Sequence, residues 1–330
     1  MASRGRSPHV YTAAWICALS IELAAAKSLL DEIHSPLSHS QPATDQNIYT
    51  LGSLAGHNIV VVCLQHGNYG TTAATSIVAQ MCQTFPSIRY GLMVGVGGGV
   101  PTREADIRLG DVVVSKPKGQ FGGVVQYDYG KACQRGHFER TGSLNKPCSL
   151  LLSAISDLDS NHTLRDVQIG KIMSDVLQRH EEQFARPDRD WLFHSAYDHQ
   201  GGSGDCLSCD IHQLVSRRLR GSDEPQIHYG LIASGNQVIK DARRRDSIAE
   251  TLPVLCFEME AAGLMDQLPC LVIRGICDYC DSHKQNDWQG YAALAAAAYA
   301  KELLSIVPVR KDIFMQREGM QLTSCRVPIY

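Results

Sequence analysis

Four short segments of the chain place carboxylates, an arginine or glycines directly after runs of residues that favour β-strands. Carboxylate and guanidinium groups carry out acid–base chemistry, and glycines let a ligand come close to the backbone. In an α/β sheet, ligands bind in the crevice outside the carboxyl ends of the strands. We therefore expect one active site assembled from residues 18–22, 94–99, 257–263 and 273–278.

Strand and helix patterns alternate along most of the chain, as they do in α/β proteins. Continuous apolar runs predict strands that are buried on both faces of a sheet. Before residue 118 we predict strands over 11–19, 48–54, 58–65, 89–96 and 111–115, and helices over 21–33 and 71–82. After residue 225 we predict strands over 228–234, 254–258 and 270–277, and helices over 238–250, 259–268 and 291–306.

These elements predict a single α/β domain with a central mixed, largely buried β-sheet flanked by helices. The domain covers residues 10–307, with 1–9 as an N-terminal extension and 308–330 as a C-terminal tail. Residues from about 118 to 225 are rich in His, Asp, Arg, Ser and Gly. Only 149–158 carry a clear helical pattern there, so we predict a long polar insertion within the domain.

Composition narrows the class of protein. The 330 residues carry a formal net charge of −3 and are 44% hydrophobic, which excludes a fibrous or wholly disordered chain and argues against a nucleic-acid partner.

The apolar stretch 10–21 resembles a signal peptide, but Glu22 stands just before the small residues that would form its cleavage site. No run reaches the about 18 apolar residues of a membrane helix. Several of the 12 cysteines lie in apolar runs, so we expect reduced thiols and a cytoplasmic protein.

Taken together, in this order and with these spacings, the four segments resemble the motifs of the nucleoside phosphorylase and nucleosidase superfamily. The pattern is most similar to bacterial methylthioadenosine/S-adenosylhomocysteine nucleosidases, which are hydrolases. Residues 227–236 and 256–264 are more similar to fungal members, which occur alone or as N-terminal modules of immune-receptor-like proteins. The resemblance extends over 10–307 and implies a nucleoside phosphorylase-like fold, a purine nucleoside or nucleotide substrate, and a homodimer or higher homo-oligomer.

The resemblance also implies a role for each charged residue of the motifs. Asp278 matches the acid that protonates N7 of the purine, and Glu260 matches the carboxylate that binds the ribose hydroxyls. Glu22 matches the carboxylate that orients or deprotonates the attacking water, which Arg274 helps to place. Glu258 is expected to be a carboxylate at a helix N-terminus, where the dipole favours it. Further substrate contacts are implied for Met259, Val96, Gly97, Asn236 and Val238.

One departure from the family pattern bears on the reaction. In the phosphorylases the strand before the glycine cluster carries an Arg, and the cluster carries a Ser, and both bind phosphate. Here these positions match Met93 and Val96, and an apolar pair cannot bind a dianion. Glu22 would also repel phosphate. Hydrolysis to free base and ribose is therefore favoured, with phosphorolysis as the alternative.

Two other interpretations of the function remain open. Basic residues at 243–245, together with Arg135, Arg140 and Lys146, could bind the phosphates of a nucleotide substrate of the ATP type. Alternatively, the chain could be a non-catalytic nucleoside-sensing module of an immune-receptor-like protein. The joint presence of Glu22, Glu260, Arg274 and Asp278 argues against loss of catalysis.

The polar insertion contains a second group of chemically active residues. Cys206 and Cys209 form a C-x₂-C pair, and histidines stand on both sides of it. A structural zinc ion would stabilise a loop too polar to build its own core. The spacing of these residues matches no standard zinc finger. We expect the reaction itself to require no cofactor, with a structural zinc ion in the insertion as a separate possibility. The candidate ligands are His199, Cys206, Cys209 and His212, with His194 nearby.

Overall fold

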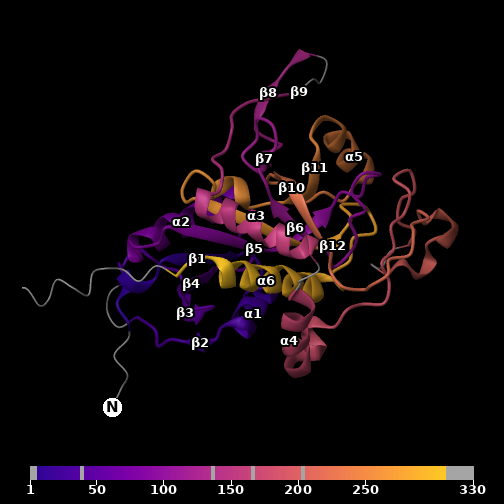
Figure 1. Cartoon of the computed structure of the whole chain (residues 1–330). Helices are drawn as coiled ribbons and strands as arrows, with labels where there is room; N and C mark the ends of the chain where they lie inside the picture. The colour runs from indigo at the N-terminus through magenta and orange to yellow at the C-terminus, as the bar shows by residue number, and fades with distance from the viewer. Residues whose placement is uncertain (1–5, 38–40, 135–137, 165–167, 202–204, 310–330) are drawn as a thin grey trace, which may run out of the picture.

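The computed structural model describes residues 6–37, 41–134, 138–164, 168–201 and 205–309, and it shows a mixed β-sheet flanked by helices (Figure 1). Within these residues the sheet has ten strands in the order β11-β10-β6-β12-β5-β1-β4-β3-β2, with β7 paired to β10. A further pairing of β11 with β5 closes five of the strands into a ring. The strands are β1 (Ala13–Cys17), β2 (Glu32–Ile33), β3 (Tyr49–Leu54), β4 (His57–Cys63), β5 (Tyr90–Gly99), β6 (Val112–Ser115), β7 (Val124–Gln126), β10 (Ile227–Ser234), β11 (Val254–Glu258) and β12 (Cys270–Asp278).

The direction of the central strands brings the predicted site segments together. β1 and β12 both run parallel to β5, which lies between them, so the carboxyl ends of all three lie at one edge of the sheet. The register pairs Arg274 with Gly95 and Asp278 with Gly98. The mixed character of the sheet comes from other pairs, because β6 is antiparallel to β12 and β3 is antiparallel to β4. The predicted fold class is confirmed.

Helices cover the two faces of this sheet. Alternate residues of β1 point to opposite faces, so that Ala13 and Trp15 belong to one hydrophobic core and Ala14 and Ile16 to another. The first core also contains residues of α1 (Ser20–Leu29), α3 (Ser149–Thr163), α4 (Ile169–Phe184) and α6 (Gln289–Ile306). The second contains residues of α2 (Thr71–Thr84). The remaining helix is α5 (Ala242–Thr251).

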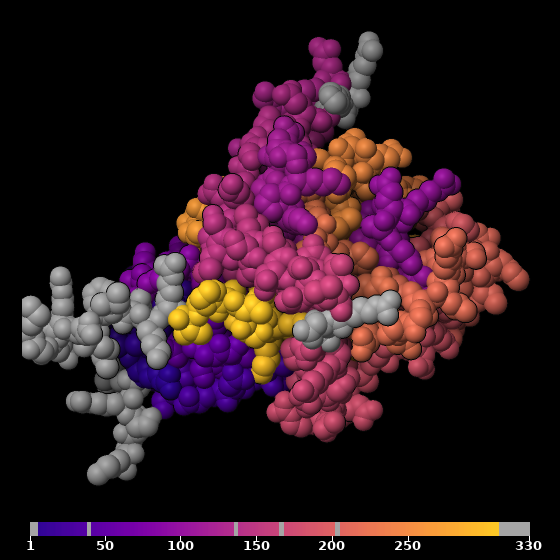
Figure 2. Space-filling model, viewed as in Figure 1, coloured from indigo at the N-terminus to yellow at the C-terminus, as the bar shows by residue number. Residues whose placement is uncertain are grey.

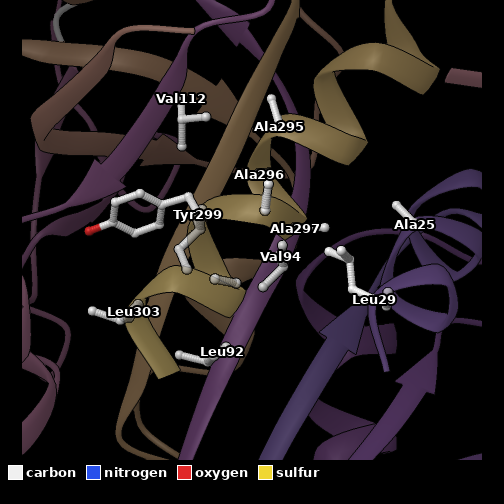
Figure 3. Packing of buried hydrophobic residues seen from close by; sticks show 14 of the residues in the cluster. Ala25, Leu29, Leu92, Val94, Val112, Ala295, Ala296, Ala297, Tyr299 and Leu303 are labelled. Carbon is white, nitrogen blue, oxygen red and sulfur yellow. The ribbon is translucent and has the colours of Figure 1, made fainter. Parts of the chain in front are cut away.

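The alanine-rich helix α6 is buried along most of its length. Its small side chains let the helix come close to the sheet, and a Cβ on Gly275 of β12 would overlap the backbone carbonyl of Ala292. Glycine at this position is therefore required by the close approach. Figure 3 shows alanines of α6 in the cluster that also contains Val94 of β5 and Leu29 of α1.

One predicted helix is wrong. Residues 259–268 form only a short 3₁₀ turn, η5 (Ala261–Gly263), followed by further turns. The Glu258 carboxylate accepts hydrogen bonds from the backbone N–H groups of Glu260 and Ala261, which fixes the chain in a tight turn. Gly263 packs so closely on the backbone of Thr71 that a Cβ would overlap it.

The segment 118–225 contains more regular structure than its composition predicts. β7 joins the main sheet, and α3 and α4 pack against α6 in the first core. The missed helix α4 places apolar residues such as Ile169, Met173 and Val176 on one face. A hairpin of β8 (Gly130–Ala132) and β9 (Phe138–Arg140) projects at the top of Figure 1. The polar stretch that remains is 187–226, on the right of Figures 1 and 2, with short turns η3 (Cys206–Ser208) and η4 (Ile211–Gln213).

The ends of the chain add little to this picture. Residues 1–5 of the predicted extension and 310–330 of the predicted tail lie outside the described residues. The described start of the chain contains the short 3₁₀ turn η1 (Pro8–Val10). The predicted hairpin between β3 and β4 is confirmed, with Ala55 and Gly56 at positive φ of 48° and 82° in its turn. Among the helices of the described ranges, none is both long enough and apolar enough to cross a bilayer.

Candidate active site

A cavity of about 250 Å³ lies at the carboxyl ends of β5, β11 and β12 and beside the start of α1. All four motif segments predicted from the sequence contribute to its walls. The predicted site residues that line it are Glu22, Val96, Gly97, Val238, Met259, Glu260, Arg274 and Asp278. The cavity is also lined by residues outside the four motif segments that the sequence analysis did not predict for the site, among them Tyr69, Lys284 and Gln289.

The Glu22 carboxylate is fixed by backbone donors. It accepts hydrogen bonds from the N–H groups of Ala18 at 2.6 Å, Leu19 at 3.0 Å and Val96 at 2.8 Å. Burial raises the pKa of Glu22, although Arg274 and these hydrogen bonds lower it. A Cβ on Gly95 would overlap the Glu22 carboxylate. A buried carboxylate with a raised pKa, held by fixed donors, is suited to orient a water molecule and to accept its proton.

Arg274 is the centre of a buried charge cluster. Its guanidinium forms an ion pair with Glu258 and lies 3.6 Å from the Glu260 carboxylate and 3.9 Å from that of Glu22. It also donates to the backbone carbonyl of Val96 at 3.3 Å. The three carboxylates raise the pKa of Arg274 despite its burial, so the side chain stays charged. Arg274 therefore contacts the carboxylates on the Glu22 side of the cavity, and none of its described contacts is with Asp278.

Glu258 and Glu260 differ in what they contact. Glu258 binds Arg274 and accepts from the N–H groups of Glu260 and Ala261, so its carboxylate holds the strand-to-turn junction. Glu260 accepts one backbone hydrogen bond, from Gly70 at 3.3 Å. Burial, together with the charges of Glu258 and Glu22, raises the pKa of Glu260 to about 7 against the opposing effect of Arg274. Glu260 thus retains oxygen lone pairs that a sugar hydroxyl could use.

Asp278 has a cationic partner that the sequence analysis missed. Its carboxylate accepts hydrogen bonds from the Lys284 ammonium at 2.6 Å, the Cys280 N–H at 2.8 Å and the Cys277 thiol at 3.2 Å. Cys280 adopts a left-handed conformation with φ of 54°, and such strain is typical of functional sites. A Cβ on Gly98 would lie 2.7 Å from the Asp278 carboxylate. The only sequence signal for Lys284 is its position six residues after Asp278.

One predicted substrate contact, Asn236, has another place in the structure. Asn236 is outside the cavity lining, and its Oδ1 accepts from the N–H and Oγ1 of Thr71, each at 3.0 Å. This carboxamide provides the cap of α2, which begins after Gly70 without a side-chain cap of its own. Met93, which matches the phosphate-binding Arg of the phosphorylases, is fully buried in the second core and does not line the cavity.

The basic residues at 243–245 have partners within the protein. Arg243 pairs with Asp198 at 3.0 Å, and Arg244 donates to Gln237 at 2.7 Å. Arg245 is buried and donates to the carbonyl of Tyr279 at 2.7 Å. Arg135, another arginine proposed to bind phosphates, stands between β8 and β9 in the sequence and lies outside the described residues.

A second cavity of about 440 Å³ adjoins the first and shares Cys277, Asp278 and Lys284 with it. Its other walls come from the polar stretch 187–226 and from the loop after β12. Cys206 is part of this wall, and its sulfur and the ligand atoms of His199 and Cys209 all lie within 4.8 Å of one another. His212 is exposed and is not part of this group.

Comparison with known proteins gives a family and two kinds of relative. The model of the phosphorylase superfamily matches residues 12–307. A nucleotide-binding leucine-rich repeat (NLR)-like protein of Hyaloscypha variabilis is 48% identical over 306 residues, covering 91% of this chain. This chain spans only 30% of the length of that relative. A 5′-methylthioadenosine/S-adenosylhomocysteine nucleosidase of Mycobacterium bovis is 22% identical over 311 residues, with 89% of this chain and 96% of the nucleosidase covered.

Solved structures share the fold at low sequence identity. The futalosine hydrolase of Helicobacter pylori is 16% identical, with a TM-score of 0.54 and coverage of 89% of this chain and 97% of its own. The methylthioadenosine/S-adenosylhomocysteine nucleosidase of Neisseria meningitidis, in complex with methylthio-immucillin-A, is 16% identical with a TM-score of 0.55, covering 90% and 99%. These likenesses confirm the fold that the sequence motifs implied. Since the family model matches nearly the whole described chain, the protein belongs to the phosphorylase superfamily.

Proposed function

We propose that this protein hydrolyses the N-glycosidic bond of purine nucleosides and releases free base and ribose. The observation that carries the proposal is the pairing of charges in one cavity. Among the described residues that line it, four are acidic, and both cations, Arg274 and Lys284, are already bound to carboxylates. A phosphate dianion would therefore meet a wall of negative charge and no free cation. Water is the nucleophile that such a site accepts.

The proposed reaction uses the two ends of the cavity differently. At one end, the protonated form of Asp278 donates its proton to N7 of the purine, so that the bond from the base to C1′ breaks with its electrons on a neutral base. The Asp278 carboxylate that this step leaves is the form that pairs with the Lys284 ammonium. At the other end, Glu22 accepts a proton from water while the water oxygen bonds to C1′. Glu260 accepts hydrogen bonds from the ribose hydroxyls and stabilises the positive charge that develops on the sugar.

Apolar groups complete the proposed substrate site. Val238, Ile239 and Phe257 line the cavity and offer apolar contacts for a purine ring. Met259, beside Glu260, also lines it and is proposed to pack against the ribose. The absence of side chains at Gly97 and Gly98 lets the sugar approach the backbone of β5. Because Arg243, Arg244 and Arg245 have partners of their own, a nucleotide substrate draws no support from them.

Product analysis tests the proposal. The purified chain is incubated with adenosine, inosine, guanosine or ATP, with and without phosphate, and the products are separated by chromatography. We expect free base and ribose from a purine nucleoside at equal rates in both conditions, and turnover at least about 10²-fold slower by the Asp278→Asn variant. Strict dependence on phosphate with ribose 1-phosphate as product would establish a phosphorylase instead. Tight binding of a nucleoside without any product would favour a sensing module.

A further inference from the structure

The polar stretch 187–226 contains a compact group of metal-binding side chains outside the candidate active site. The ligand atoms of His199, Cys206 and Cys209 all lie within 4.8 Å of one another. Both cysteines are buried and unoxidised, with exposed fractions of 6% and 7%. Buried thiols that face each other and an imidazole are an unusual arrangement for a chain segment with so little apolar material.

The distances fit a tetrahedral zinc ion. Zinc binds thiolate sulfur and imidazole nitrogen at about 2.3 and 2.0 Å, which puts neighbouring ligand atoms about 3.5 to 3.8 Å apart. The three side chains are therefore within about 1 Å of this spacing before any adjustment to a metal. Two thiolates with imidazole are donors that select zinc over magnesium or calcium, which prefer oxygen.

A second observation points to a missing partner at this place. The Nε2 atom of His199 is buried and has no hydrogen-bond partner among the described residues. The ring of His283 lies 5.5 Å from the ring of His199, and both of its nitrogens are likewise buried without a hydrogen bond. Buried polar atoms normally have partners, and a metal ion would satisfy such nitrogens without a proton.

The surroundings explain what an ion would do for the fold. Among the described residues of this stretch, Phe193, Cys206 and Cys209 form a small apolar cluster, with Trp191, Tyr197 and Leu214 packed around it. Such a segment cannot bury enough apolar surface to order itself. Metal binding supplies folding free energy directly, because the ligands are brought together only in the folded state.

We propose that His199, Cys206 and Cys209 form a structural zinc site that fastens this stretch to the loop after Asp278. The connections to that loop are short. The His199 N–H donates to Ser282 at 2.9 Å, and the Gln285 side chain donates to the Cys206 sulfur at 2.9 Å. The same loop carries Lys284, the partner of Asp278. The zinc site thus stabilises a wall of the second cavity and the loop whose Lys284 contacts the candidate acid Asp278. The fourth zinc ligand is His283 or a water molecule.

Metal analysis of the purified chain tests the site without any enzyme assay. We expect about one tightly bound zinc ion per chain after purification in reducing buffer without chelator. Cys206→Ser and Cys209→Ser should each lower the zinc content at least about tenfold, since the loss of a ligand weakens binding no less than the loss of an outer contact. Two matched controls, His212→Asn in the same stretch and Cys133→Ser on an exposed cysteine, should keep wild-type zinc.

Cobalt substitution keeps the test valid if a cysteine variant fails to fold. Wild-type chain stripped of metal and loaded with Co²⁺ should show a thiolate-to-cobalt charge-transfer band and the intense visible bands of a tetrahedral site. A change of the visible bands in His283→Asn, with the charge-transfer band retained, would identify His283 as the fourth ligand. A zinc-free wild-type chain that also gives no such band would overturn the proposal. A Cys206–Cys209 disulfide that persists in the chain purified in reducing buffer would also overturn the proposal.

Discussion

The two ends of the candidate active site carry different balances of charge. At the end formed by α1 and β11, three carboxylates (Glu22, Glu258 and Glu260) share the single guanidinium of Arg274. At the end formed by the loop after β12, one carboxylate, Asp278, has the ammonium of Lys284 to itself. The first end is negative when all groups are ionised, and the second is neutral.

This difference separates two tasks that one cavity has to perform in the proposed reaction. A negative wall stabilises a sugar that becomes cationic and repels a phosphate nucleophile. It also raises the pKa of Glu260 to about 7. At the neutral end, Lys284, Cys277 and Cys280 donate hydrogen bonds to Asp278 and hold its carboxyl group in place for the proposed proton transfer to the base.

The largest effect is expected from Glu22→Gln, which removes the proton acceptor from the negative end. Both Glu22 oxygens accept backbone N–H groups, so the amide of Gln also faces a donor instead of an acceptor. We expect kcat to fall about 10² to 10⁴-fold, the usual contribution of a general base, with the chain still folded by circular dichroism. The exposed Glu104→Gln is the matched control and should keep wild-type kcat. A variant at Glu22 with wild-type kcat would remove this residue from the mechanism.

A comparison of Glu260→Gln with Glu258→Gln sharpens the division within the negative end. Loss of a hydrogen bond to a charged group costs about 1.5 to 3 kcal/mol, so Glu260→Gln should lower kcat/KM about 10 to 100-fold without lowering Tm. Glu258 is the ion-pair partner of buried Arg274 and holds two N–H groups of the turn. Glu258→Gln should therefore mainly lower the free energy of unfolding, by about 3 kcal/mol. A larger loss of kcat/KM at Glu258 would reverse the two roles.

The raised pKa of Glu260 predicts a pH-dependent stability. Between its ordinary value of 4.5 and about 7, the folded chain keeps a proton on Glu260 that the unfolded chain has released. The free energy of unfolding should therefore fall as pH rises through this window, by up to about 3 kcal/mol from this group. Denaturant unfolding at several pH values should show this slope in the wild type and in Glu104→Gln. The same slope in Glu260→Gln would show that another group causes it.

The smallest effect is expected at Asn236, which the sequence motif assigned to substrate. Its carboxamide caps α2 through Thr71, and loss of a cap typically costs about 1 kcal/mol. Asn236→Ala should lower Tm by a few degrees and leave KM unchanged. An increase in KM without a change in Tm would return Asn236 to the substrate site.

Sequence reasoning reached the site because its motifs sit at strand ends. Glu22, Arg274 and Asp278 follow long apolar runs, and parallel strands bring their carboxyl ends to one edge of the sheet. The pattern could not reveal Lys284, because its ammonium reaches Asp278 through the loop after β12, and loop geometry leaves no periodic signal. Asn236 is the opposite case: the motif predicted a substrate contact, but the side chain caps α2, a helix distant in sequence.

Helix prediction failed in two places for opposite reasons. The helix predicted after Glu258 is replaced by a 3₁₀ turn, because a buried carboxylate and a close contact of Gly263 with Thr71 override the local pattern. Helix α4 was missed because polar residues surround its apolar face, which becomes apparent only against α6. The contact of Gly263 with Thr71 and the packing of α4 against α6 are tertiary contacts, which no local window contains.

The division of tasks between the two ends can be tested most directly by changing the leaving group. Single-turnover rates are measured for the wild type, Asp278→Asn and Glu22→Gln, on a purine nucleoside and on p-nitrophenyl riboside, whose phenolate leaves without protonation. We predict that Asp278→Asn slows the purine nucleoside by about 10²-fold or more and the nitrophenyl substrate very little, because only the purine needs the acid. Glu22→Gln should slow both. A folded Asp278→Asn variant that cleaves the purine nucleoside at the wild-type rate, or loses equal rate on both substrates, would contradict the assignment of Asp278 as the acid.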